Sequence, residues 1–353
     1  MVKTKEHLDK LIRIGGHSGR YDYMRLDMNE NPTGLPEEFI ERVKNKITPS
    51  FLATYPEVTR IKKKLADYLG VKENNLAIAN GSDSEIKYIF EAFVNPSDKI
   101  LMVNPTFEMY PVYTEMYQGI PLLVDYDSEM QVSFDEFYEK AHFADIIVIL
   151  NPNNPIGTIF SHEQIECVIK VAQENDALVV IDEAYHYFYA GTCLDLAIKY
   201  DNVLLLRTFS KLCSLAACRV GFAVGNEKLI EYVSKVQPTY DVNAFAILFV
   251  ESLLDNIEVI DGLIAEEKIG REYLSKKLAA EKIPHNQSES NYIFINCEDK
   301  VAELEKELEG QGILIKTYSK PLLKNFIRVT TGRKEVMDKF CEVFIPLYHS
   351  LLN

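Results

Sequence analysis

The sequence has little positive charge. Its 353 residues contain 38 lysines and arginines against 53 aspartates and glutamates, which gives a formal net charge of -15 at pH 7. Nucleic-acid backbones and anionic membrane surfaces repel a chain of this charge, because both are bound through clustered cationic side chains. We therefore expect neither nucleic acid nor membrane as a partner, although a local pocket can still be basic.

Paired cysteines and long apolar runs are also missing. The six cysteines show no CxxC spacing, which indicates reduced thiols rather than a disulfide framework or a zinc site. No cluster of histidines and carboxylates has the spacing of metal ligands. The first sixteen residues hold no apolar signal core, and no segment reaches the roughly 18 apolar residues that a membrane helix needs. We expect a cytoplasmic protein without a bound metal.

Apolar residues, in contrast, are plentiful. They make up 47% of a chain that is longer than one ordinary domain, enough for a large core. Amphipathic stretches alternate with short apolar runs, which lie at 76–79, 100–103, 120–124, 145–150, 178–182, 203–207 and 220–224. This alternation predicts an α/β fold with a mostly parallel seven-stranded sheet flanked by helices. The gap between the last two runs is too short for a crossover helix, so one of these strands should run antiparallel.

The two ends of the chain differ from its middle. Residues 1–44 are polar and contain a turn-rich segment, NENPTG. From about residue 226 onward long helical patterns dominate, followed by two β-type runs at 291–296 and 326–331. We expect a large domain over residues 45–245 and a smaller α+β domain that combines 1–44 with 246–353.

Lys211 follows the apolar run 203–207 within a polar turn, and Arg219 comes eight residues later. In open α/β sheets, ligands bind beyond the carboxyl ends of the strands. A lysine held near other cations loses its proton more easily and can form a Schiff base with a carbonyl compound. Most lysines are solvated surface residues, so this interpretation depends on what the neighbouring strand ends supply.

A second predicted strand end leads into the turn NGSD, residues 80–83. Exposed N–H groups and the dipole of the following helix attract an anion there, and Gly81 lets a phosphate approach closely. The alternative is an ordinary helix cap with Ser82 or Asp83 as the N-cap residue. The chain contains neither GxGxxG nor GxxxxGK[ST], so a dinucleotide fingerprint or a P-loop does not explain this turn.

Two further strand ends supply an acid and an amide. Asp182 ends the run 178–182, where it can bind a metal, act as a base or hold a protonated ring nitrogen. The turn NPNNPIGT, residues 151–158, directs an asparagine toward the same edge. A phosphate-type turn, an amide, an acid and a lysine together describe a pocket for an anionic aromatic aldehyde, pyridoxal 5'-phosphate.

With these residues in place, the sequence resembles the class I and II, fold type I aminotransferases, and most closely their histidinol-phosphate aminotransferase group. The matching motifs extend over nearly the whole chain in family order: LDMNENPTG (26–34), TYP (54–56), NGSD (80–83), PTFEMY (105–110), NPNNPIGT (151–158), DEAY (182–185), TFSK (208–211), RVGF (219–222) and IRVTTG (327–332). The resemblance implies a pyridoxal-phosphate-dependent transaminase of amino-acid metabolism.

The resemblance also implies roles around the cofactor ring. Lys211 forms the Schiff base and later moves the proton, and Asp182 pairs with the ring nitrogen. Asn154 and Tyr185 hydrogen-bond the ring hydroxyl oxygen, which lowers the pKa of the Schiff base. Tyr110 stacks on the ring face. The phosphate end is implied to include Gly81, Ser82, Asp83, Thr208, Ser210 and Arg219.

Further implied residues concern the substrate and a second subunit. Tyr55 is implied to reach the phosphate in the partner subunit, so we expect a homodimer with shared active sites. Arg328 matches the arginine that binds the substrate carboxylate, and its planar fork suits that group. Asn243 and Asn291 match positions near the pocket. Glutamate is the expected amino donor, and an oxo compound is the acceptor.

The chain departs from the group at two positions. Ile156 replaces a threonine in the NPTG motif and removes a hydroxyl near the cofactor. Lys316, in GILIK, stands where the group commonly has an arginine, and it offers charge without the bidentate fork. Histidinol phosphate is therefore one possible substrate among anionic or phosphorylated amino compounds.

Two alternative functions remain at this point. Threonine-phosphate decarboxylases resemble the same group and use the same cofactor residues, and the choice depends on which substrate bond stands perpendicular to the ring. A non-catalytic regulator would keep the fold and add a basic DNA-binding module. The acidic composition and the start of the fold within the first thirty residues disfavour the regulator.

Overall fold

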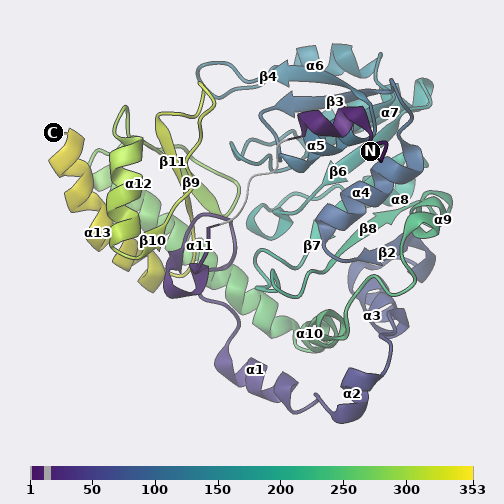
Figure 1. The fold of residues 1–353 in the computed structure, drawn as a ribbon, viewed down its shortest axis with the longest axis horizontal. Helices are drawn as coiled ribbons and strands as arrows, with labels where there is room; N and C mark the ends of the chain where they lie inside the picture. Colours follow the sequence, from purple (N-terminus) through teal and green to yellow (C-terminus); the bar gives the residue numbers. More distant parts are fainter. Residues whose placement is uncertain (1, 12–16, 353) are drawn as a thin grey trace.

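The computed structural model describes residues 2–11 and 17–352 and centres on a seven-stranded sheet (Figure 1). Its strands lie where the apolar runs predict them: β2 (Leu76–Ala79), β3 (Lys99–Asn104), β4 (Ile120–Asp125), β5 (Ile146–Leu150), β6 (Leu178–Asp182), β7 (Val203–Thr208) and β8 (Gly221–Gly225). The spatial order is β2-β8-β7-β6-β5-β3-β4. The predicted α/β fold with a seven-stranded sheet is confirmed.

Strand direction in this sheet also follows the prediction. β8 runs antiparallel to both of its neighbours, β7 and β2, whereas all other pairs are parallel. The short connection between β7 and β8 leaves no room for a crossover helix, which explains the reversal. The remaining strands therefore point the same way, and their carboxyl ends meet at one edge of the sheet.

Helices cover both faces of the sheet (Figure 1). Ile147 and Ile149 of β5 join one apolar core, and Ile146 and Val148 of the same strand join the other. Burial on both faces explains why these strands are continuous apolar runs. The second core includes α4 (Ser82–Phe93), α5 (Met109–Met116) and α9 (Glu227–Val236), and the first includes α3 (Thr59–Leu69), α6 (Phe134–Ala141), α7 (His162–Glu174) and α8 (Leu194–Lys199).

A third apolar core lies beside the large sheet and is built from both parts of the chain that flank it. The antiparallel pair β9 (Tyr292–Asn296) and β11 (Phe326–Thr330) packs with three helices, α11 (Ile257–Ala280), α12 (Val301–Gly310) and α13 (Lys334–Leu352). The N-terminal strand β1 (Met24–Arg25) pairs with β10 (Ile313–Leu314). This smaller α+β unit is the one expected from the two chain ends.

Helices near the predicted domain boundaries pack with the large sheet. Phe39 and Val43 of α1 (Glu37–Lys44) belong to its first core, as does much of α10 (Ala244–Leu254). The short helix α2 (Pro49–Ala53) and the 3-10 turns η1 (Glu6–Lys10), η2 (Arg20–Asp22), η3 (Glu73–Asn75) and η4 (His186–Phe188) complete the described elements. The division at residues 45 and 245 stays a prediction.

The helices of the described residues give no membrane-spanning candidate, since none combines the necessary length with enough apolar character. The expected cytoplasmic location stays a prediction. Part of the N-terminal stretch on which it depends, residues 1 and 12–16, lies outside the described residues.

Candidate active site

The predicted polar residues gather at one edge of the large sheet. Asp182 is the last residue of β6, and Lys211 lies three residues beyond the end of β7. Gly81 follows β2, which points the same way. Arg219 precedes β8, and because β8 is antiparallel, its beginning lies at the edge where the other strands end. The topology therefore brings together residues that are up to 138 positions apart in the chain (Gly81 to Arg219).

The amine of Lys211 lies in a cationic and partly enclosed environment. Its Nζ donates a hydrogen bond to the Met28 carbonyl at 3.1 Å and lies 5.8 Å from the centre of the Tyr185 ring. Burial, followed by the charges of Arg328 and Arg219, lowers the pKa of Lys211 to about 8, although Glu30 and Asp182 act in the opposite direction. A neutral amine, the form that attacks a carbonyl, is thus accessible close to neutral pH.

Asp182 is buried and hydrogen-bonded on both carboxylate oxygens. One oxygen accepts from the Tyr110 hydroxyl at 2.7 Å, and the other accepts from the Ala184 backbone N–H at 3.0 Å. Burial raises the pKa of Asp182 to about 6, and the two hydrogen bonds and Lys211 limit the rise. A cation placed next to this buried carboxyl group would stabilise its ionised form. The stacking role predicted for Tyr110 stays a prediction.

The N-terminus of α4, predicted as the phosphate end, lies at the same edge of the sheet. Gly81 is the N-cap residue, with a φ of 88°, and no side chain of the described residues caps this helix end. The alternative of an ordinary cap by Ser82 or Asp83 is therefore wrong. Asp83 instead accepts a hydrogen bond from Tyr113. The first N–H groups of a twelve-residue helix consequently remain available for an anion.

Arg219 lies beside this helix end. A Cβ atom built on Gly81 would lie 2.6 Å from Arg219 Nη2, so glycine is the residue that permits the close approach. Arg219 also donates to the Ser210 hydroxyl at 3.3 Å, and the Ser210 backbone N–H donates to the Thr208 hydroxyl at 3.1 Å. Thr208, Ser210 and Arg219 thus form one connected group next to Gly81, and their binding of a phosphate stays a prediction.

Arg328 lies on β11 of the smaller unit and faces the large sheet. It donates to the Asn154 side-chain oxygen at 2.8 Å and to the Asp27 carbonyl at 2.6 Å. Its Cζ lies 5.2 Å from the centre of the Tyr292 ring. Within the described part of the chain, the buried Nε of Arg328 has no partner. The predicted substrate arginine and the predicted cofactor asparagine are therefore in direct contact.

Lys316 and Arg328 lie opposite each other on adjacent antiparallel segments, with their backbone groups exchanging hydrogen bonds of 3.1 and 2.8 Å. Directly opposed residues project from the same face of such a pair. Both cationic groups lie 5.9 Å from the centre of the Tyr318 ring, and the buried hydroxyl of Tyr318 has no partner among the described residues. Two cations and one buried hydroxyl therefore border the same space.

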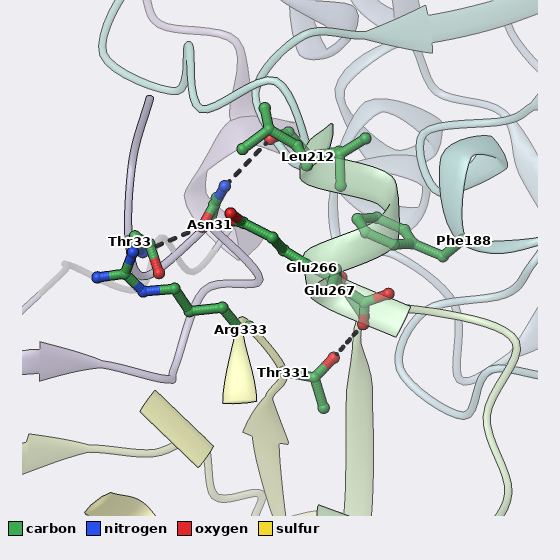
Figure 2. Close-up of a pocket in the computed structure, with 11 residues that line it drawn as sticks. Asn31, Thr33, Phe188, Leu212, Glu266, Glu267, Thr331 and Arg333 are labelled. Carbon is green, nitrogen blue, oxygen red and sulfur yellow. Dashed lines mark hydrogen bonds between the residues drawn. The ribbon is translucent and has the colours of Figure 1, made fainter. Parts of the chain in front are cut away.

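Asn291 and Leu212, the residue after Lys211, line the same small pocket. The amide nitrogen of Asn291 donates to the Asn29 carbonyl at 3.0 Å, and its buried side-chain oxygen is unpaired as far as the described residues extend. Figure 2 shows the Asn31 side chain reaching toward Leu212 across this pocket, which α11 closes on the other side. Asn291 therefore lies near the lysine, and its substrate-binding role stays a prediction.

Two predicted residues, Tyr55 and Asn243, contact residues that were not predicted for the site. Tyr55 is 72% exposed and stacks on Tyr240, with ring centres 4.3 Å apart. Its predicted contact with the phosphate in a partner subunit stays a prediction. Asn243 caps α10 by accepting from the Ala246 N–H and donates to the Cys218 carbonyl, so its contacts are those of a helix cap.

The N-terminal segment 26–31 contributes contacts that the sequence interpretation did not assign. The carbonyl groups of Asp27 and Met28 accept from Arg328 and Lys211, and the Asn29 amide donates to the Tyr185 hydroxyl at 3.0 Å. The polar run LDMNEN was visible as a motif, but its role depends on partners far along the chain. The segment links the large sheet to the smaller unit at the site.

These observations fit a ligand with the groups of pyridoxal phosphate. An uncapped helix end with Arg219 suits a phosphate, the Asp182 carboxylate suits a protonated ring nitrogen, and the Lys211 amine suits an aldehyde. Buried polar atoms without partners in the described chain, on Arg328, Asn291 and Tyr318, lie on the side of the smaller unit. The donor set matches both the charge and the polarity of such a molecule.

Known proteins resemble this chain over most of its length. The profile of the family Aminotransferase class I and II matches residues 21–344. A histidinol-phosphate aminotransferase of Clostridium novyi is 34% identical over 321 residues, which cover 88% of this chain and 88% of that protein. The histidinol-phosphate aminotransferase of Thermoanaerobacter pseudethanolicus is 33% identical over 335 residues, covering 91% and 92%.

Solved structures share the fold at lower sequence identity. The histidinol-phosphate aminotransferase from Sinorhizobium meliloti, in complex with pyridoxal-5'-phosphate, gives a TM-score of 0.87 at 19% identity and covers 99% of each chain. The enzyme of the same name from Clostridium acetobutylicum gives 0.83 at 21% identity, covering 93% of this chain and 99% of that one. The likeness extends over both units of the fold.

Proposed function

This chain belongs to the class I and II aminotransferase family and is a pyridoxal-phosphate-dependent transaminase, and we propose that its amino substrate is a phosphorylated amino compound of the histidinol-phosphate type. The observation that best supports the transaminase function is the Lys211 amine. It lies beyond the carboxyl end of β7, and burial together with the charge of Arg328 lowers its pKa to about 8. We further propose glutamate as amino donor and a homodimer with shared sites.

The geometry of the sheet edge supports the cofactor residues that we propose. When bound, pyridoxal phosphate supplies an aldehyde carbon for the amino group and a ring that accepts negative charge. Asp182 would hold the proton on the ring nitrogen, and Asn154 with Tyr185 would contact the ring hydroxyl. The Gly81 turn and Arg219 would hold the phosphate. Lys211, neutral above about pH 8, would accept and return the substrate proton.

The anionic side of the substrate is the second part of the proposal. Arg328 and Lys316 project from the same face of their strand pair and border the space near Tyr318. Two positive charges on this side support a substrate with a negatively charged group. The relatives named above are histidinol-phosphate aminotransferases, which supports a phosphorylated compound over a simple amino acid.

Decarboxylation on the same scaffold is the alternative that the sequence left open. The family and its relatives are named for amino transfer, so the decarboxylase is not favoured.

The Tyr55–Tyr240 stack, with Tyr55 72% exposed, is consistent with a surface that a second subunit covers, and it supports the proposed homodimer.

A half-reaction screen tests the function. The holoprotein is mixed with histidinol phosphate, phosphoserine or phosphothreonine, and the absorbance change from the aldehyde to the amine form of the cofactor is recorded together with released carbon dioxide. We expect the absorbance change with histidinol phosphate, no carbon dioxide from phosphoserine or phosphothreonine, and no absorbance change in Lys211→Ala. Stoichiometric carbon dioxide without an oxo product would instead establish the decarboxylase.

A further inference from the structure

Asn29 occupies an unusual position in the N-terminal segment. It is 1% exposed and has a φ of 57°, a left-handed conformation that asparagine tolerates better than most other residues with side chains. Its side chain lies between Tyr185, in the turn that follows β6 of the large sheet, and Thr330 on β11 of the smaller unit.

The hydrogen bonds around Asn29 have a fixed direction. The backbone N–H of Asn29 can only donate, and it donates to the Thr330 hydroxyl oxygen at 3.0 Å. The hydroxyl hydrogen of Thr330 then points to the Asn29 side-chain oxygen at 3.3 Å. The oxygen end of the Asn29 amide therefore faces Thr330, and its NH₂ end faces the Tyr185 hydroxyl at 3.0 Å.

This direction determines what the Tyr185 hydroxyl can do. Its oxygen already accepts a hydrogen bond from Asn29, so its own hydrogen remains free to donate elsewhere. The phenol stays protonated at neutral pH, because burial raises the pKa of Tyr185 to about 12. The Lys211 amine lies 5.8 Å from the centre of the same ring, so the hydroxyl belongs to the site.

We propose that Asn29 is a positioning residue that keeps the Tyr185 hydroxyl a hydrogen-bond donor toward the ring oxygen of pyridoxal phosphate, with Thr330 fixing the orientation of the Asn29 amide. The inference rests on the proposed function and extends it to a residue that acts through Tyr185. A donor at the ring oxygen stabilises the deprotonated oxygen, which favours the lower pKa expected for the lysine–cofactor linkage.

The backbone around Asn29 is held on several sides, which the proposed role requires. The Asn291 amide donates to the Asn29 carbonyl at 3.0 Å, and the Thr330 N–H donates to the Leu26 carbonyl at 2.9 Å. Met28, the preceding residue, accepts from Lys211. The Asn29 amide is therefore presented to Tyr185 from a segment that contacts both units of the fold.

Asn29→Asp tests the direction of the network. An ionised carboxylate has no hydrogen to donate, so it would accept the Tyr185 hydrogen and turn it away from the cofactor. The pH midpoint of the holoprotein's absorbance change should rise by about 1 pH unit, a tenfold change in proton affinity, and should approach that of Tyr185→Phe. Asn29→Gly keeps the left-handed backbone and leaves the Tyr185 hydrogen free, so its midpoint should rise less than half as far.

Asn31→Asp is the matched control for charge. It adds the same carboxylate two residues away, where Asn31 contacts the Leu212 carbonyl rather than Tyr185. Its midpoint should stay within about 0.3 pH unit of the wild type, a shift that corresponds to a twofold change in proton affinity. Thermal unfolding of the cofactor-free proteins shows whether each variant folds.

Three outcomes decide between the explanations. Equal shifts of the pH midpoint in Asn29→Asp and Asn31→Asp would show that the added negative charge alone causes the shift, and would overturn the positioning role. A wild-type midpoint in Asn29→Asp, with a shifted Tyr185→Phe, would overturn it as well. If the wild-type protein takes up no pyridoxal phosphate, the proposed function itself fails, which is a different result from either of these.

Discussion

Arg207 and Glu183 form a buried ion pair that joins the strand leading to Lys211 with the residue after Asp182. Arg207 Nη2 and Nε lie 2.8 and 3.0 Å from one Glu183 oxygen, and both side chains are almost completely excluded from solvent. Glu183 also accepts from the Thr192 hydroxyl and the Cys193 N–H. The pair connects β7 with the loop that follows β6, close in sequence to both Asp182 and Lys211.

Removing one member of this pair should destabilise the protein strongly. Arg207→Met leaves the Glu183 charge buried without its cation, which costs about 3–5 kcal/mol of unfolding free energy. Denaturant unfolding of the cofactor-free protein measures this loss. Lys235→Met breaks the exposed Lys235–Glu231 pair and should leave the unfolding midpoint unchanged. A loss below about 1 kcal/mol in Arg207→Met would show that the pair is not an important link.

The pH dependence of Lys211 reactivity follows from its environment. Burial and nearby cations disfavour the charged amine, so Lys211 deprotonates near pH 8 instead of 10.5. In the cofactor-free protein, modification of Lys211 by trinitrobenzenesulfonate should accelerate about tenfold per pH unit and level off above pH 8. Peptide mass spectrometry reports the rate at each lysine. The exposed Lys235, whose pKa is raised by its hydrogen bond to Glu231, should keep accelerating well above pH 8, and a Lys211 profile identical to that of Lys235 would contradict the assignment.

Gly81 offers a test of the phosphate end. Gly81→Ala places a methyl group against Arg219 and an L-residue at a φ of 88°, so we expect pyridoxal phosphate affinity to fall at least about tenfold. Gly34→Ala is the matched control, because Gly34 has a φ of 81° and open space around its missing Cβ. Gly34→Ala therefore introduces a similar backbone strain without a methyl group that presses on Arg219. Equilibrium dialysis against the cofactor separates the two, and equal losses would argue against the Gly81 turn.

The fold was accessible from the sequence because its strands are buried on both faces. Runs such as 146–150 and 178–182 are continuous apolar segments, and the short interval between β7 and β8 marked the reversed strand. Lys211 and Asp182 could be placed for the same reason, since each follows such a run directly. Local sequence and sheet topology together position these two residues.

The contacts of Asn29 could not be predicted in this way. Its partners, Tyr185 and Thr330, lie 156 and 301 residues away, on separate units of the fold. The helix end at Gly81 was ambiguous for a related reason: Ser82 and Asp83 are both residue types that cap helices, and only the position of Arg219 and the uncapped N–H groups distinguishes the two interpretations. Long-range geometry, rather than residue type, decides both cases.

Lys316 gives the sharpest test of substrate choice, because it lies opposite Arg328 and the two cations share one face. A charge-assisted contact to a phosphate is worth about 1.5–3 kcal/mol, so Lys316→Ala should lower kcat/KM for histidinol phosphate about tenfold to a hundredfold. Activity with unphosphorylated histidinol should hardly change. Lys316→Arg restores the bidentate fork and should match or exceed the wild type with the phosphorylated compound. Lys324→Ala removes an exposed lysine shortly before β11 and controls for general loss of charge. Equal losses with histidinol and histidinol phosphate in Lys316→Ala would mean that Lys316 shapes the site without contacting the phosphate.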